Sequence, residues 1–378
     1  MAGLLVTLGI VFGDIGTSPL YVMKAIESVT PDYSPEYIIG AVSCVIWTLT
    51  LQTTIKYVLL ALRADNKGEG GILALFALLR KKYGKKLWIV AAIGAAALVA
   101  DGVITPAVTV TSAIEGLEIV MPHVPIIPIV TLIILFIFIM QQMGTGKIGK
   151  FFGPFMLLWF LMLGTLGSLN IHLCPGIFKA FNPWWAIKLL CTNPEWFLIL
   201  GAVFLCTTGA EALYSDLGHC GRKNISVSWI FVKIMLILNY LGQGAWLLSS
   251  PKDAGINPFY GIMPEWFTFI GVIMSTGAAI IASQALLSGS FTIFSEAMNL
   301  VLWPKLKIKY PSREKGQLYI PAVNWALLAG CLLTVLIFRD SSHMEAAYGL
   351  AITITMLMTT VLLTFYLHSL NVNIVICS

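Results

Sequence analysis

The sequence predicts an all-α integral membrane protein with about ten transmembrane helices, and three observations support this prediction. Of the 378 residues, 58% are hydrophobic and only 11% are charged, whereas a soluble domain carries about 25% charged residues. The mean hydropathy is +0.88. Apolar segments of roughly 20 residues, long enough to cross a bilayer, recur along the whole chain. The net charge of +5 gives no reason to expect nucleic acid as a partner, and the expected partner is the lipid bilayer.

The apolar segments predict the spans one by one. We expect them at residues 3–26, 37–62, 87–117, 125–141, 151–169, 196–217, 226–249, 264–290, 319–338 and 344–369. Together they would form a single transmembrane domain over residues 1–369, followed by a short tail of residues 370–378.

Basic residues are divided unevenly between the predicted loops. Sixteen Lys and Arg residues fall in the loops that follow the even-numbered spans, and four fall in the opposite loops. Because cytoplasmic loops carry the excess of Lys and Arg, this bias predicts a multi-pass protein of the plasma membrane with both termini in the cytoplasm. Lys24, Lys56 and Lys233 lie within spans, and we expect their ammonium groups to extend back toward the membrane surface.

The first span carries polar residues where an ordinary spanning helix has none. Gly13, Gly16 and Pro19 are expected to break the helix, and Asp14 and Tyr21 lie beside the break at mid-membrane depth. Irregular backbone at that depth is tolerated only where it is buried in protein or lines a cavity. An ionisable residue there indicates a functional site. The stretch therefore predicts a binding site built on a discontinuous helix.

The sixth span is interrupted in the same way, around Thr208, Gly209 and Glu211. Five spans separate it from the first, so the two would enter the membrane from opposite sides. Interrupted segments at corresponding positions of two halves are typical of transporters built from inverted repeats. Asp216 lies near the cytoplasmic end of this span, where a gating role and a structural role are both open.

The third span carries a polar stripe. At 3.6 residues per turn, Asp101, Thr105, Ser112 and Glu115 fall within about 80° of one another on an otherwise apolar helix. An unpaired charge at the centre of the membrane costs at least about 2.5–3.5 kcal/mol. Because no basic residue was expected deep enough to compensate these groups together with Asp14 and Glu211, the counter-charge would be a transported cation, a proton, or both. Carboxylate, hydroxyl and carbonyl oxygens suit a hard ion such as an alkali cation.

Five blocks of sequence resemble the signature of the KUP/HAK/KT family of potassium uptake permeases. They are residues 11–21 (VFGDIGTSPLY), 68–75 (GEGGILAL), 100–107 (ADGVITPA), 209–219 (GAEALYSDLGH) and 346–351 (AAYGLA). The matches occur in order and cover nearly the whole chain.

The resemblance implies secondary active uptake of K⁺ coupled to H⁺ by alternating access. It also implies the amino acid–polyamine–organocation (APC/LeuT-like) fold, a five-plus-five inverted repeat with broken helices 1 and 6. The first repeat would cover about residues 3–169 and the second about residues 196–369. The ion site would lie between spans one, three, six and ten.

The family's functional residues carry over to matching positions of this chain. K⁺ would be bound by Asp14, Tyr21, Thr105, Thr109, Thr208 and Tyr348. Glu115 and Glu211 would be essential carboxylates, with Glu115 the preferred proton carrier, and Asp101 would support the site. The resemblance implies no cofactor and no metal other than the transported K⁺.

Family members usually continue with two more spans and a cytoplasmic domain, which this chain is expected to lack. Those parts serve dimerisation and regulation in relatives, so a homodimer and the activity of the shorter chain stay open. Two alternatives also stay open: an H⁺-coupled amino-acid transporter on the same fold, and a transport-inactive homologue retained for sensing. A potassium channel is disfavoured because the sequence has no Thr-Val-Gly-Tyr-Gly filter. Nothing in the sequence supports an enzyme.

Overall fold

The structure is a computed structural model that describes residues 2–30, 33–84, 86–142, 149–249, 255–311 and 318–370. Within these ranges the chain is helical almost throughout, apart from loops and two isolated antiparallel bridges, one between Asn66 and Glu69 and one between Lys309 and Tyr319. Five of the basic residues counted in the predicted loops lie outside the described residues: Lys85, Lys147, Lys252, Arg313 and Lys315. Residues 371–378 of the predicted tail also lie outside them.

The helical segments follow one another without a strand between them in the described ranges. The first half contains α1 (Ala2–Ile10), α2 (Gly13–Thr17), η1 (Ser18–Leu20), α3 (Val22–Val29), α4 (Pro35–Thr48), η2 (Leu49–Leu60), η3 (Ala61–Arg63), α5 (Ile72–Tyr83), α6 (Trp88–Glu115), α7 (Leu117–Val120), α8 (Ile126–Gln141) and α9 (Gly149–Ile171). The second half contains η4 (Pro175–Phe181), α10 (Trp184–Thr192), α11 (Trp196–Phe204), η5 (Leu205–Thr207), α12 (Ala210–Ser215), α13 (Leu217–Cys220), α14 (Arg222–Ser249), α15 (Pro258–Gly261), α16 (Glu265–Asn299), α17 (Pro321–Phe338) and α18 (Ser341–Ser369).

Each predicted span coincides with helix in the structure. Among the described residues, eight helices are long and apolar enough to cross a membrane, and the bent pair formed by residues 3–10 and 13–20 makes nine. The remaining apolar helix, α8, has 16 residues. The prediction of an all-α integral membrane protein is therefore confirmed, while the count of ten spans stays a prediction.

The first predicted span is broken twice. α1 ends at Ile10 and the next segment begins at Gly13, with a bend of 64° between the two. A second interruption lies at Tyr21, between η1 and α3. Gly13 lets α2 approach α16 closely, because a Cβ at this position would lie 3.0 Å from Cα of Ala282. The sharp bend thus comes earlier than Gly16 and Pro19, which lie within α2 and η1.

Side chains from other elements satisfy the carbonyl groups of this irregular segment. Trp159 Nε1 on α9 donates to the carbonyl of Gly16 at 2.9 Å, Gln243 Nε2 on α14 to that of Pro19 at 3.0 Å, and Asn257 Nδ2 to that of Leu20 at 2.8 Å. Buried backbone groups need such partners, because an unpaired one costs about as much as a lost hydrogen bond. These donors explain how the break is held in the interior of the bundle.

The sixth predicted span is broken between η5 and α12. Thr208 is extended and Gly209 has a φ of +78°, a conformation that favours glycine. A Cβ at Gly209 would lie 2.8 Å from the backbone nitrogen of Ile15 and 3.0 Å from Cβ of Asp14. The break in the sixth span is therefore packed directly against the break in the first.

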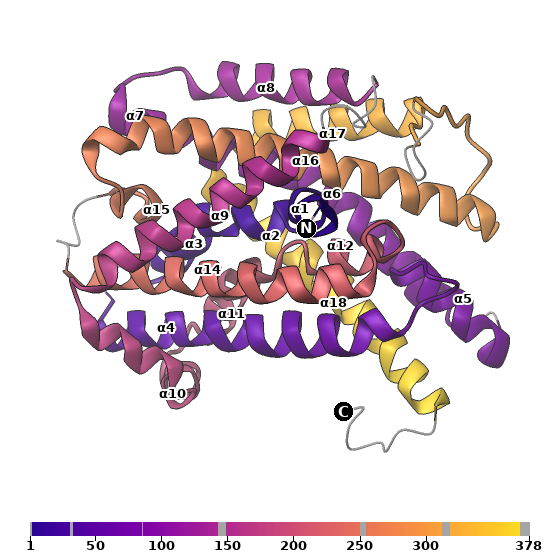
Figure 1. Ribbon diagram of the computed structural model, residues 1–378, viewed down its shortest axis with the longest axis horizontal. Coiled ribbons are helices and arrows are strands. Elements are labelled where there is room, and N and C mark those ends of the chain that lie inside the picture. Colours follow the sequence, from indigo (N-terminus) through magenta and orange to yellow (C-terminus); the bar gives the residue numbers. More distant parts are fainter. Residues whose placement is uncertain are drawn as a thin grey trace.

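The remaining helices surround these two breaks. Figure 1 shows α1 and α2 near the middle of the helical bundle, with α8 along one edge and α4 along the opposite side. The most extensive helix contacts join α6 to α18 and α9 to α14. As a result, α6 and α18 place their polar residues beside the broken first helix.

Candidate ion-binding site

Asp14 lies on α2 in the interior of the protein and is only 4% exposed. Its Oδ1 accepts a hydrogen bond from the hydroxyl of Tyr348 at 3.3 Å. Its Oδ2 is buried and has no hydrogen-bond partner among the described residues. A buried oxygen without a donor is costly and calls for an explanation such as a bound ion or water. Asp14 therefore offers a free carboxylate oxygen to a cation.

A chain of hydrogen bonds connects Asp14 to a second buried carboxylate. The hydroxyl of Thr105 lies 2.9 Å from the hydroxyl of Tyr348 and donates to Oδ1 of Asp101 at 2.6 Å. All four side chains are at most 5% exposed. The chain crosses from α2 through α18 to α6, so three helices supply oxygen atoms to one network, the Asp14–Asp101 network.

Tyr21 and Thr208 form a second polar contact between the two breaks. Their hydroxyl groups are 3.1 Å apart, and both side chains are buried. The ring of Tyr21 meets the ring of Tyr348 edge to face with centroids 6.0 Å apart. The structure thus brings together five of the six predicted K⁺ ligands: Asp14, Tyr21, Thr105, Thr208 and Tyr348. The sixth, Thr109, is buried one turn along α6, where its hydroxyl donates to the carbonyl of Thr105 at 2.7 Å.

Glu211 lies at the start of α12 in a separate cluster. Its Oε2 accepts a short hydrogen bond from the hydroxyl of Tyr57, and its Oε1 accepts one from Thr359 at 2.7 Å. The charge of Lys56 also interacts with Glu211, although the Lys56 ammonium itself donates to the carbonyl of Met356 at 2.8 Å. Glu211 is 4% exposed, so two hydroxyl groups and a nearby cation together support this buried carboxylate.

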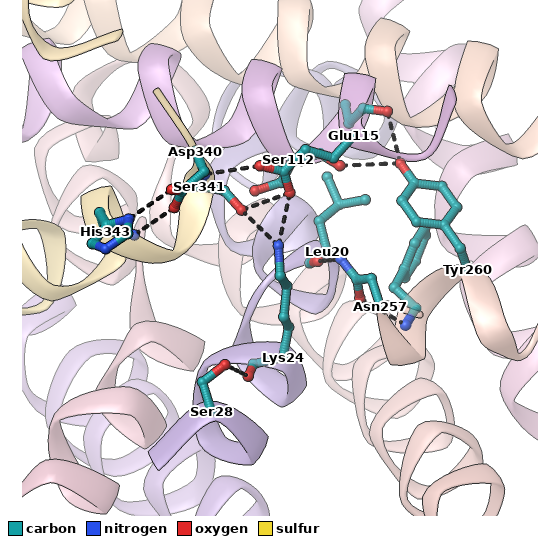
Figure 2. A network of polar contacts seen from close by, with 12 residues as sticks. Leu20, Lys24, Ser28, Ser112, Glu115, Asn257, Tyr260, Asp340, Ser341 and His343 are labelled. Carbon is teal, nitrogen blue, oxygen red and sulfur yellow. Dashed lines mark hydrogen bonds and ion pairs between the residues drawn. The ribbon is translucent and has the colours of Figure 1, made fainter. Parts of the chain in front are cut away.

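Glu115 ends α6 and is tied to α3 and α18 (Figure 2). The ammonium of Lys24 lies 2.9 Å from its Oε2, which also accepts the hydroxyl of Ser341 at 2.7 Å. The backbone N–H of Ser341 donates to Oε1 at 2.8 Å. Two residues of the polar stripe predicted on span three thus contact α18, Thr105 through Tyr348 and Glu115 through Ser341. Glu115 is nevertheless outside the Asp14–Asp101 network.

Each of the three lysines within spans has a polar partner in the structure, and their extension toward the membrane surface stays a prediction. Lys24 pairs with Glu115, Lys56 reaches a carbonyl of α18, and Lys233 donates to the hydroxyl of Thr54 at 3.2 Å. Lys24 compensates Glu115 alone, so the expectation that no basic residue compensates all the buried acids together stays a prediction. Lys24 follows Tyr21 by three residues, so the helical periodicity could have placed it on the face that carries Tyr21.

A cleft reaches Asp14 from one side. It is lined by Asp14, Ser215, Asp216 and Ser290, among others. An adjoining pocket shares Ser215 and Asp216 and continues to Gly70, Gly71 and Glu296. Asp216 lies between α12 and α13, with its Oδ1 3.8 Å from Nδ1 of His219. The residues of these two pockets connect the candidate ion site with the segment that precedes α5.

Sequence reasoning missed the partners that stabilise the site from outside the motifs. Tyr57, Thr359 and Gln243 lie outside the motifs on otherwise largely apolar helices, and each makes its contact with a residue more than 140 positions away. Only the packing of the helices brings such pairs together. Their one signal in the sequence is that each is a polar residue within a predicted span.

Comparison with known proteins gives consistent results over the whole chain. A family model described as "K+ potassium transporter integral membrane domain" matches residues 1–378. The chain is 58% identical to the "Probable potassium transport system protein Kup" of Flavobacterium psychrophilum over 374 residues, which cover 97% of this chain and 57% of that relative.

Two further relatives carry the same printed name. The chain is 59% identical to the protein of Cytophaga hutchinsonii over 373 residues, covering 97% of this chain and 56% of the relative. It is 54% identical to the protein of Streptococcus agalactiae over 382 residues, covering 97% and 57%. The chain thus spans a little more than half the length of these relatives.

Proposed function

The chain belongs to the K+ potassium transporter family, and from this membership we propose that it takes up K⁺ together with H⁺ across the plasma membrane. Its similar relatives are named as potassium transport proteins. The observation that carries the proposal is the free Oδ2 of Asp14 beside the hydroxyl groups of a buried network. Oxygen donors of this kind suit an alkali cation.

We assign K⁺ to the space beside Asp14, with Tyr21, Thr105, Thr208 and Tyr348 as the neighbouring oxygen donors. Asp14 supplies the negative charge, and the four hydroxyl groups replace part of the hydration shell of the ion. Thr109 stays a further candidate ligand one turn along α6, because donating its hydrogen to the carbonyl of Thr105 leaves the lone pairs of its hydroxyl oxygen free.

Charge balance supports the coupling of K⁺ to H⁺. Asp14 and Asp101 belong to one hydrogen-bonded network, and two negative charges in a low-dielectric interior repel each other strongly. One K⁺ on Asp14 and one proton on Asp101 would neutralise the network. With its charges neutralised, the loaded site would change between its outward-facing and inward-facing orientations at a lower free-energy cost than the charged site.

The other two essential carboxylates have different partners. Glu115 is compensated by the ammonium of Lys24, whereas Glu211 is held by the hydroxyl groups of Tyr57 and Thr359. We therefore place the transported proton on Asp101 or Glu211 ahead of Glu115, which the sequence had favoured. Glu115 keeps an essential part as the residue that ties α6 to α3 and α18.

Alternating access is supported by the unequal surroundings of the site. On one side, the cleft beside Asp14 passes Asp216 toward the segment before α5, which the distribution of basic residues predicts to be cytoplasmic. At the end of α6, the Lys24–Glu115 pair and Ser341 connect three helices. We assign this arrangement to an inward-facing state of the transporter.

We extend the proposal to the architecture. The two broken helices pack against each other at the site, as in transporters built from inverted repeats. Residues 3–169 and 196–369 would be the two repeats of one transport domain, with both termini in the cytoplasm. A homodimer would be the assembly to test first.

Growth on low K⁺ tests the proposed function. Cells that lack their own K⁺ uptake systems and express the protein should grow at K⁺ concentrations too low for the same cells without it, and the Asp14→Asn variant should not restore growth. Equal amounts of both proteins in the membrane fraction are the control. Failure of the unsubstituted protein to restore growth would contradict the function, whereas growth supported by Asp14→Asn would contradict the site.

A further inference from the structure

The ammonium of Lys24 lies where three helices meet, away from the Asp14–Asp101 network. It is 2.9 Å from Oε2 of Glu115 and 3.2 Å from Oγ of Ser341. The side chains of Lys24 and Glu115 are 26% and 14% exposed. In Figure 2 the lysine extends from its helix toward the start of α18, with Glu115 and Ser341 around its tip. The ammonium is thus surrounded by oxygen atoms in a partly buried position.

A second carboxylate of this cluster is not satisfied. Glu345 is one turn into α18, is 3% exposed, and its Oε1 has no hydrogen-bond partner among the described residues. Glu345 lies four residues, one helical turn, beyond Ser341 on α18, and the charges of Lys24 and Glu115 act on it. Asp340 is turned toward His343, with its Oδ2 2.6 Å from Nδ1 of that ring. The cluster therefore contains two carboxylates: Glu115 contacts the ammonium, and Glu345, one turn into α18, keeps a free, buried oxygen.

We propose that Glu115, Ser341 and Glu345 form a second cation site, the outer cation site, and that the ammonium of Lys24 occupies it in this structure. A lysine ammonium is a compact point charge that binds oxygen acceptors, and K⁺ is a monovalent cation of similar size that binds the same kind of oxygen atoms. The site would accept K⁺, Rb⁺ or NH₄⁺ whenever Lys24 withdraws. The surplus of negative charge provides the attraction for such an ion.

Exchange of Lys24 for a free ion would have a mechanical consequence, which rests on the proposed function. The pair ties α3 to α6, and Ser341 ties α18 to the same carboxylate. All three helices also lead to the proposed ion site: α3 directly follows Tyr21, α6 carries Thr105 and α18 carries Tyr348. A cation that takes the place of Lys24 breaks the link between α3 and the other two helices. Binding of the ion at this site would therefore allow α3 to move relative to α6 and α18.

Equilibrium binding of ⁸⁶Rb⁺ to the purified full protein tests the outer cation site. Lys24→Met empties the site without adding a charge, so the variant should bind one Rb⁺ more per chain than the unsubstituted protein. The additional Rb⁺ should disappear in Lys24→Met/Glu345→Gln. Lys188→Met is the matched control, because it breaks an exposed Lys–Glu pair, with Glu36 at 2.6 Å, and should leave the number unchanged. An equal number of Rb⁺ in Lys24→Met and the unsubstituted protein would overturn the proposal.

The same comparison in an Asp14→Asn background separates this inference from the proposed function. The gain of one Rb⁺ on Lys24→Met should persist there even though the Asp14 site is removed, and its loss there would overturn an independent outer site.

Chemical labelling of the unsubstituted protein tests the same proposal if the Lys24→Met variant fails to fold. Raising K⁺ at constant ionic strength, with choline as the balancing cation, should increase labelling of Lys24 by an amine-reactive reagent several-fold and leave Lys188 unchanged. An extent of Lys24 labelling that does not change with the K⁺ concentration would also overturn the proposal.

Discussion

The hydroxyl of Tyr348 lies 3.3 Å from Oδ1 of Asp14, although the two residues are 334 positions apart in the sequence. The contact joins α18 to the broken first helix, and the hydroxyl is also 2.9 Å from that of Thr105. Tyr348 therefore connects the residue with the free carboxylate oxygen to the polar stripe of α6.

Tyr348→Phe should weaken K⁺ uptake while preserving the packing of the ring against Tyr21. A hydrogen bond to a charged group contributes about 1.5–3 kcal/mol, so the KM for K⁺ should rise about 10- to 100-fold. Initial rates of ⁸⁶Rb⁺ uptake into cells measure it. Tyr366→Phe is the control, because Tyr366 lies about 27 Å farther along the same helix. An unchanged KM in Tyr348→Phe would exclude the hydroxyl from the ion site.

Thr359→Val should destabilise the protein because it removes a donor from the buried Glu211. The expected cost is about 1–3 kcal/mol, that of leaving a buried acceptor without a partner. Thr360→Val provides a neighbouring comparison, since its hydroxyl donates only to the carbonyl of Met356 at 2.7 Å. Thermal unfolding of the purified variants should give a clearly lower midpoint for Thr359→Val. Equal midpoints for the two variants would speak against a stabilising role of this hydrogen bond.

Gly209→Ala should impair both folding and transport. An alanine at a φ of +78° costs about 1–2 kcal/mol, and its Cβ would lie 2.8 Å from the backbone of Ile15. The two breaks would have to move apart, and the contact of Tyr21 with Thr208 would be lost. Gly201→Ala is the control, because a Cβ there meets no atom within 4 Å. Normal ⁸⁶Rb⁺ uptake by Gly209→Ala would show that the close packing of the two breaks is not required.

Asp340 should make the stability of the protein depend on pH in the acid range. Its carboxylate caps α18 by accepting the backbone N–H of His343 at 3.0 Å. Burial raises the pKa of Asp340, but the hydrogen bonds from the backbone and ring of His343 lower it by more, and the net pKa is lowered. The stabilisation is therefore present above the ordinary pKa of about 3.9 and is lost as the pH falls through the lowered value.

The test of this cap compares the unsubstituted protein with Asp340→Ser, which keeps an uncharged cap. The unfolding midpoint of the unsubstituted protein should fall more steeply below about pH 4 than that of Asp340→Ser. Asp340→Ala, which has no cap, should be less stable by about 0.5–2 kcal/mol at neutral pH. Parallel pH profiles for the unsubstituted protein and Asp340→Ser would contradict a role for the carboxylate charge.

Much of the fold could be predicted from the sequence, because a bilayer imposes a simple rule on composition. Apolar segments of spanning length marked the helices, and Gly13, Gly209 and the polar residues beside them marked the two interruptions. The sharp bend at residues 11–12 lies directly before Gly13, while Gly16 and Pro19 lie within α2 and η1. Glycine and proline indicate where a helix can break, and packing decides at which of these positions it bends.

The site could be predicted in part. Asp14, Thr105 and Tyr348 lie in the motifs, and the structure brings them together. The pairing of Lys24 with Glu115 and of Tyr57 with Glu211 depends on how distant helices pack, which helical periodicity within a single span does not report. Asp101 and Glu115 were expected on one stripe about 21 Å apart along the helix, but that they have different partners depends on the packing of α6 against α3 and α18.

Uptake of ⁸⁶Rb⁺ or K⁺ into proteoliposomes that contain the purified protein tests the central claim most directly. With an inwardly directed proton gradient, the unsubstituted protein should accumulate the ion, a protonophore should abolish the accumulation, and Asp14→Asn should show none. Uptake that is unchanged when the proton gradient is collapsed, or that persists in Asp14→Asn, would contradict proton-coupled potassium transport through the Asp14 site.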